Sequence, residues 1–157
     1  LGFNNSLASL MLLPVVVAMG VGAPVMGRIL DRVGSKILMI AGGLLLSAGL
    51  LIFGLLGFQI YFFILSGIFI GLGLSSLLGA PIRYIMLKEF PVSDRAAGQG
   101  LININSSVGQ LIGATLVGAI IASMGNGVSA YEFAYIILAL TALIITFLSF
   151  GLKGRMG

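Results

Sequence analysis

The chain has 157 residues, of which 59% are apolar and only 8% are charged, with a formal net charge of +4. Soluble domains carry about 25% charged residues, so this composition excludes a water-soluble fold and indicates an integral membrane protein. The chain contains no Cys and no His, which excludes a disulfide framework and metal sites built on thiolate or imidazole ligands. We therefore expect neither a metal nor a cofactor.

Five apolar stretches are long enough to cross a bilayer as helices. A spanning helix needs about 20 mostly apolar residues, because the hydrocarbon core is about 30 Å thick. These stretches are about twice as long as barrel strands and lack strict apolar/polar alternation, which favours helices over a barrel. The sequence predicts a single all-α transmembrane domain over residues 1–157, with spans at about residues 7–26, 37–56, 60–82, 101–124 and 133–152.

The basic residues all fall on one side of these spans. The linkers after the first and third spans, together with the tail, hold all eight Lys and Arg residues, and the other two linkers hold none. Lys and Arg near span ends are retained in the cytoplasm, so the chain is expected to start outside and end in the cytoplasm. The same rule explains the net charge, and no nucleic-acid partner is expected. The odd number of spans and the first residue, Leu1, predict a fragment of a longer protein.

The predicted spans differ in how many polar and small residues they carry. The second and fifth are nearly all apolar and can face lipid, whereas the first, third and fourth carry polar groups and glycines that are expected to face protein or water. In the fourth span, the polar face either lines a wet cavity or bonds to a neighbouring helix. The candidate substrate contacts are Ser66, Asn103, Ser107 and Gln110, and the candidate helix-packing residues are Gly67, Gly71, Gly109 and Gly113.

The four carboxylates are dispersed near the ends of the spans, at Asp31, Glu89, Asp94 and Glu132. No proton or cation site inside the bilayer is therefore expected from this chain. Asp94 precedes the fourth span, where an Asp side chain commonly caps a helix start. Because the chain has no Cys or His and its carboxylates are not paired, acid/base chemistry has no evident site and the chain is not expected to be an enzyme.

The linker after the first span combines glycines with charged residues in the pattern Gly-x-x-x-Asp-Arg-x-Gly-x-Lys. An ordinary basic loop accounts for the cations, but not for the Asp and the two glycines. The pattern resembles the best-known loop motif of the major facilitator superfamily. The matching positions are Gly27, Asp31, Arg32, Gly34 and Lys36, and Ser35 stands where the family commonly has a basic residue.

Further stretches resemble the C-terminal half of the drug:proton antiporter branch of that family. They are Leu13 to Gly27, Gly71-Leu72-Gly73, and Phe90-Pro91 leading to Gly98. The resemblance implies a multidrug efflux transporter of the plasma membrane, which exchanges small amphipathic compounds for protons by alternating access. It also implies that residues 27–36 form a cytoplasmic gate. The N-terminal half, with the coupling carboxylates, would then be missing from this chain.

A second interpretation is a small structural or assembly subunit of the membrane that binds partner helices through its glycine faces and transports nothing. Its loop motif would then be coincidental or vestigial. The reading frame upstream separates the two interpretations, because further spans with a second such loop would favour the transporter.

Overall fold

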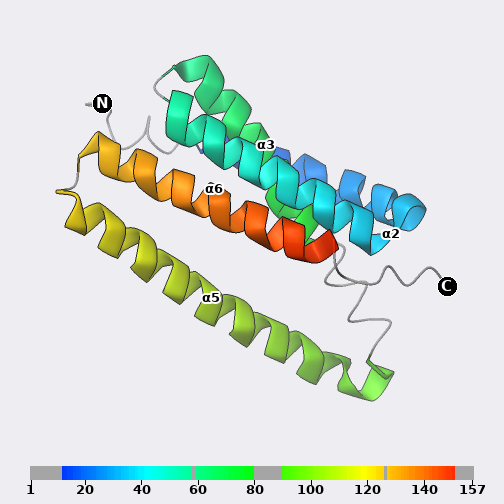
Figure 1. Ribbon diagram of the computed structural model, residues 1–157. Helices are drawn as coiled ribbons and strands as arrows, with labels where there is room; N and C mark the ends of the chain where they lie inside the picture. The colour runs from blue at the N-terminus through cyan, green and yellow to red at the C-terminus, as the bar shows by residue number, and fades with distance from the viewer. Residues whose placement is uncertain (1–11, 58, 80–89, 126, 151–157) are drawn as a thin grey trace.

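The computed structural model describes residues 12–57, 59–79, 90–125 and 127–150 (Figure 1). Every regular element in these residues is helical. The elements are α2 (Leu13–Leu56), α3 (Ile60–Leu78), the short 3-10 helix η1 (Val92–Asp94), α5 (Arg95–Ser123) and α6 (Val128–Phe150). Four helices among the described residues are long and apolar enough to cross a membrane: α2, α3, α6 and the combined helical stretch 92–123.

Helix α2 is bent and contains most of the first two predicted spans. Its 44 residues would extend about 66 Å as a straight helix, roughly twice the thickness of the bilayer core. The bend lies at Gly34, whose φ of 80° and ψ of 164° are costly for any residue with a Cβ. We call residues 13–33 the first arm and residues 35–56 the second arm. The five spans and their orientation remain predictions.

Helix α3 packs closely against both arms of α2. A Cβ added to Gly71 would lie 2.5 Å from the carbonyl oxygen of Val15 in the first arm. A Cβ added to Gly73 would lie 2.7 Å from the backbone nitrogen of Leu46 in the second arm. Such approaches between backbones are possible only where a residue lacks a side chain, and they let membrane helices gain van der Waals contact. The glycines of α3 therefore hold the two arms to the same helix.

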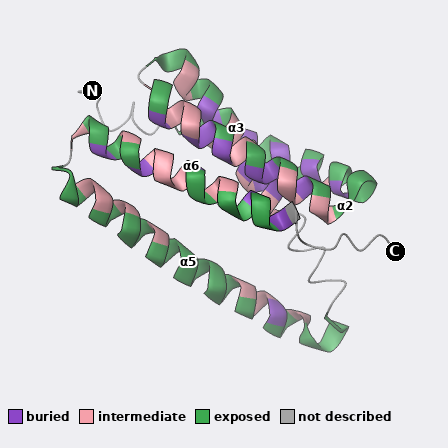
Figure 2. Ribbon diagram, in the orientation of Figure 1, coloured by how far each residue is buried: buried purple, intermediate pink, exposed green. Residues whose placement is uncertain are grey.

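Helix α6 packs against a second, adjacent face of the second arm and runs antiparallel to it: Gly43 lies against Thr146 and Gly54 against Tyr135, whereas the preceding residue Gly42 faces α3. The hydroxyl of Ser47 donates a buried hydrogen bond of 3.1 Å to the carbonyl oxygen of Ala139. Towards the other end, the rings of Phe53 and Tyr135 lie 4.5 Å apart. The second arm is thus enclosed by α3 and α6, and Figure 2 shows the buried residues concentrated where these helices meet. The expectation that this nearly all-apolar span can face lipid took no account of its buried small residues, because a hydropathy average does not show on which face of the helix such residues lie.

Helix α5 lies apart from α2 and α3 (Figure 1). None of the 18-residue apolar stretch that qualifies it as a membrane span is buried. Gly98 is its buried residue, and a Cβ there would lie 3.3 Å from the ring of Phe90. The remaining glycines of α5 have open space around them: no atom lies within 4 Å of a Cβ built on Gly100, Gly109, Gly113 or Gly118. Most of the surface of α5 is therefore free to meet something outside the described chain.

Two helices begin earlier than the apolar stretches from which they were predicted. Helix α5 begins at Arg95 and α6 at Val128. The polar residues at these starts lower the mean hydropathy and were left outside the predicted spans, but they still form regular helical turns. The predicted capping by Asp94 is wrong: this residue precedes α5 but its side chain makes no capping hydrogen bond. Its φ of −106° and ψ of 0° differ from the extended backbone that points a capping side chain at the helix start.

Candidate functional site

The loop motif is helical up to Gly34 rather than an open loop. On the inner side of the bend, Met26 and Leu30 of the first arm form a buried cluster with Leu38 of the second arm. Leu72 of α3 packs against this cluster. The cluster holds the two arms together next to the bend, so the motif is presented on a fixed support.

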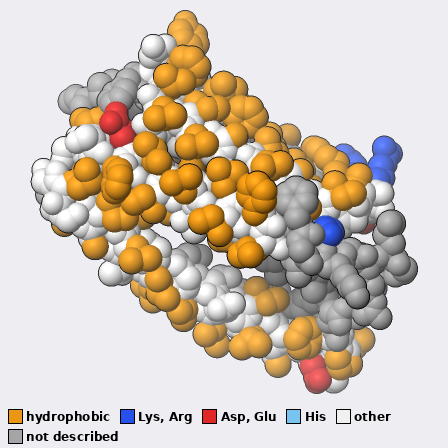
Figure 3. Space-filling view, in the orientation of Figure 1, with side chains coloured by type: hydrophobic (Ala, Val, Ile, Leu, Met, Phe, Trp, Pro, Cys, Tyr) orange, Lys and Arg blue, Asp and Glu red, His pale blue; other side chains and the backbone are white. Residues whose placement is uncertain are grey.

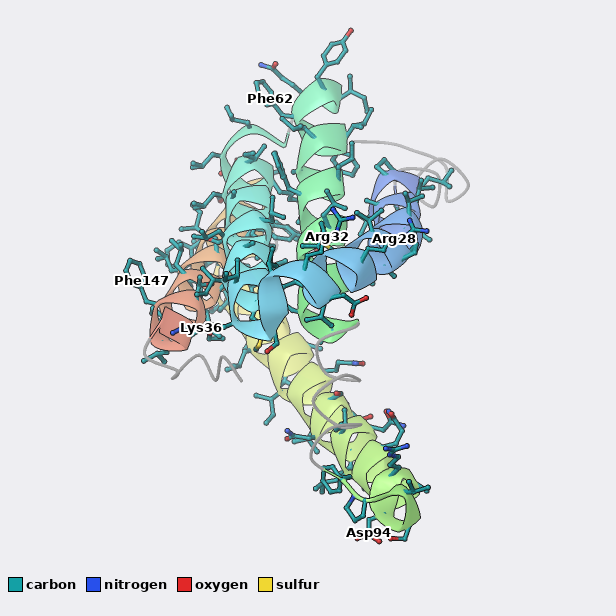
Figure 4. All side chains as sticks on the ribbon, turned by 90° about the vertical axis from the view of Figure 1, so that its right-hand side faces the viewer. Arg28, Arg32, Lys36, Phe62, Asp94 and Phe147 are labelled. Carbon is teal, nitrogen blue, oxygen red and sulfur yellow. The ribbon has the colours of Figure 1, made fainter. Side chains whose placement is uncertain are left out.

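The charged residues of the motif segment point away from that cluster. Arg28, Asp31 and Arg32 are exposed, and Lys36 is half-buried. Arg28 and Arg32 lie on one side of the bundle and Lys36 on the other, near the end of α6 (Figure 4). Figure 3 shows the visible Lys and Arg side chains gathered at this end of the bundle. Within the described part of the chain, the carboxylate of Asp31 makes neither a hydrogen bond nor an ion pair.

Replacing Gly34 with Ala tests whether the bend depends on its backbone conformation. We expect Gly34→Ala to lower the free energy of unfolding by about 1–3 kcal/mol, because a Cβ is strained at a φ of 80°. The unfolding midpoint of the purified protein in detergent measures this loss. Gly20→Ala is the matched control, since a Cβ at Gly20 meets nothing within 4 Å. Equal midpoints for the two variants would show that the bend tolerates a side chain.

The four candidate substrate contacts are not brought together by this chain alone. Ser66 is buried in α3, and its hydroxyl donates a 2.8 Å hydrogen bond to the carbonyl oxygen of Phe63. Asn103, Ser107 and Gln110 are exposed on α5, which is separated from α3 by the rest of the bundle. The α5 residues thus form a polar face, and Ser66 belongs to the interior of the α2–α3 packing.

The candidate packing glycines divide in the same way. Gly67 and Gly71 lie against the first arm, where a Cβ on Gly67 would lie 3.2 Å from a methyl carbon of Val15. Gly109 and Gly113 of α5 have no neighbour within 4 Å of an added Cβ. The first pair therefore allows α3 to pack closely against α2, whereas the second pair packs against no other part of the described chain.

Two features of the site were not predicted. The second arm carries small residues seven positions apart, Gly42 with Gly49 and Ser47 with Gly54, and all four are buried. This spacing repeats one helix face and would have identified the packing surfaces. The second feature is a hydrogen bond of 3.0 Å from the side-chain amide of Gln99 to that of Asn103, which a spacing of four residues permits.

A comparison with family models finds one match, described as Major Facilitator Superfamily, over residues 1–155. The chain belongs to the major facilitator superfamily. Transporters of this superfamily handle small-molecule substrates within the lipid bilayer and are generally not enzymes. Membership and the apolar helices together identify this major facilitator as a multi-pass integral membrane protein.

Two curated relatives are similar to this major facilitator over part of their length. Multidrug resistance protein Stp of Mycobacterium tuberculosis is 25% identical over 123 residues, which cover 78% of this chain and 23% of that protein. The uncharacterized MFS-type transporter YfiU of Bacillus subtilis is 26% identical over 116 residues, covering 74% of this chain and 22% of that protein. The chain thus spans less than a quarter of the length of these relatives. No solved structure matches it.

Proposed function

We propose that this chain is the C-terminal part of a secondary transporter that exports small amphipathic compounds in exchange for protons. Superfamily membership and the similarity to a multidrug resistance protein support this function. Transport would proceed by alternating access, in which two halves rock about a central site. The N-terminal half of the same protein would provide the coupling carboxylates, because no acidic residue lies in the middle of an apolar span of this chain.

The observation that carries this proposal is the outward presentation of the motif charges. Asp31 is exposed on a rigid helical support and has no partner among the described residues. A carboxylate in this position can accept charge-assisted hydrogen bonds from the opposite half. These bonds would form when the cytoplasmic side closes and would break when it opens. The motif would therefore stabilise the outward-facing state.

The open polar face of α5 is the proposed substrate surface of this half. Asn103, Ser107 and Gln110 are exposed there, and their amide and hydroxyl groups can bond to the polar part of an amphipathic compound. Ser66 also belongs to the proposed contacts, but its hydroxyl is already bonded within its own helix. We therefore expect its removal to affect transport less than the removal of Asn103 or Gln110.

Uptake by inside-out vesicles that contain the complete protein tests the function. An acidic vesicle interior should drive accumulation of a fluorescent amphipathic dye, and a protonophore should abolish it. Vesicles without the protein provide the baseline. Dye accumulation of the same size with and without the proton gradient would contradict proton coupling. Accumulation no greater than the baseline for a broad set of dyes would favour a subunit without transport activity.

A further inference from the structure

The exposed surface of the first arm carries a row of valines that leads to two arginines. Val17, Val21 and Val25 are 53%, 62% and 41% exposed. Arg28 and Arg32 follow at the end of the arm next to the bend, and both are exposed. The spacing of these five residues places them within a sector of about 80° on the helix, and we call them the valine–arginine face. This face is apolar along its length and basic at its end.

Asp31 lies on a neighbouring face of the same arm. At about 100° per residue, its side chain is turned by about 60° from Arg28 and by about 100° from Arg32. Its carboxylate makes no ion pair with either arginine, and neither guanidinium has a hydrogen-bond or ion-pair partner among the described residues. Gly20 and Pro24 are exposed in the same sector as Asp31. The arm therefore presents two separate surfaces, one with the carboxylate and small side chains and one with the valines and arginines.

The valine–arginine face has the dimensions of one bilayer leaflet. Eleven positions separate Val17 from Arg28, which is a rise of about 16 Å along the helix. Half of the hydrocarbon core measures about 15 Å. With the guanidiniums at the level of the phospholipid headgroups, the valines lie beside the acyl chains of the same leaflet. The arm belongs to a multi-pass integral membrane protein, so a phospholipid can reach this face from the surrounding bilayer.

The charge at the end of the face favours a phospholipid with a net negative charge. Two of the four Lys and Arg residues in the described part of the chain lie here, one helical turn apart. A guanidinium offers a planar fork of N–H donors that can bond two phosphate oxygens at once. The headgroup of a zwitterionic lipid also carries an ammonium, which Arg28 and Arg32 would repel, whereas an anionic headgroup such as phosphatidylglycerol carries none.

We propose that the valine–arginine face binds an anionic phospholipid, with the phosphate at Arg28 and Arg32 and an acyl chain along the valines. This inference goes beyond the proposed transport function and does not depend on it. The neighbouring face keeps Asp31 accessible to the opposite half of the transporter. The bound lipid lies beside the proposed gate, at the boundary between the first arm and the bilayer.

The test places a fluorophore on this face of the complete protein. Val21→Cys, in a background without other cysteines, is labelled with bimane and reconstituted into bilayers of phosphatidylcholine and phosphatidylglycerol. Either lipid is supplied with brominated acyl chains, which quench the fluorophore on contact. Brominated phosphatidylglycerol should quench more strongly at equal mole fraction. Replacing both arginines, Arg28→Gln with Arg32→Gln, should lower this preference by about tenfold, because each basic residue near the headgroups attracts anionic lipid.

Lys36→Gln with Arg95→Gln is the matched control, because it removes the same number of charges elsewhere. Lys36 lies on the other side of the bundle, and Arg95 begins α5 (Figure 4). This variant should keep the preference for phosphatidylglycerol. Equal quenching by the two lipids when both arginines are present, or a preference unchanged by their replacement, would overturn the lipid site. Quenching by neither lipid would overturn it as well, since another helix of the complete protein would then cover the face.

Discussion

Asp31→Asn in the complete protein is expected to reduce transport by about tenfold or more while leaving membrane insertion intact. Asp31 is exposed and unpaired within the described chain, so its charge is not needed for the folding of this half. A charge-assisted hydrogen bond contributes about 1.5–3 kcal/mol, and each 1.4 kcal/mol is roughly a tenfold change in an equilibrium. Losing such a bond to the opposite half would depopulate the outward-facing state. Vesicle transport, normalised to the amount of protein in the membrane, measures the effect.

Asp94→Asn is the control for a change of charge alone. Asp94 is also exposed, and its side chain makes no capping bond to α5. Figure 4 shows it at the far tip of α5, well away from Arg28 and Arg32. This variant should transport normally. Normal transport by Asp31→Asn as well would contradict a gating role for the motif.

Gly73→Ala is expected to destabilise the bundle, since its added Cβ would meet backbone atoms that cannot rotate away. That Cβ would lie 2.7 Å from the nitrogen and 2.8 Å from the Cα of Leu46. The helices α3 and α2 would have to separate, and overpacking of this kind costs about 1–3 kcal/mol. We expect a lower unfolding midpoint and a smaller yield of folded protein in detergent.

Gly118→Ala separates this steric effect from a general intolerance of glycine replacement. Gly118 lies in α5, and a Cβ there meets nothing within 4 Å. Because Ala favours helix over Gly, this variant should unfold at the same midpoint or slightly higher. If Gly73→Ala were as stable as Gly118→Ala, the close contact between α3 and the second arm would not exist in the folded protein.

The sequence pattern anticipated the helical nature of the chain better than the details of its packing. Hydropathy located the apolar stretches because a helix that spans the bilayer needs about 20 apolar residues. This requirement does not depend on which other helices pack against it. The same criterion missed the starts of α5 at Arg95 and of α6 at Val128, since a helix can continue through polar residues. The hydroxyls of Thr141, Thr146 and Ser149 donate to carbonyl oxygens four residues earlier in α6, so these polar residues are satisfied within their own helix.

The candidate site was only partly accessible to sequence reasoning. The motif positions from Gly27 to Lys36 could be recognised from their order along the chain, but not the fact that this segment is helical up to Gly34. The polar residues of α5 could be assigned to one helix face, whereas the position of Ser66 away from that face depends on how α3 packs.

What the sequence determined by itself was the membrane environment, the all-helical class and the superfamily. These depend on composition, on the length of apolar runs and on one local motif, which act along a single segment at a time. Only the tertiary structure decided that the second arm is the enclosed helix and that α5 stays open. The reason is that every span is apolar enough to face lipid, so hydrophobicity alone does not determine which helices pack against each other. The packing partners are instead determined by small residues such as Gly73 and by single hydrogen bonds such as that from Ser47 to Ala139. These interactions form only when two helices are in contact.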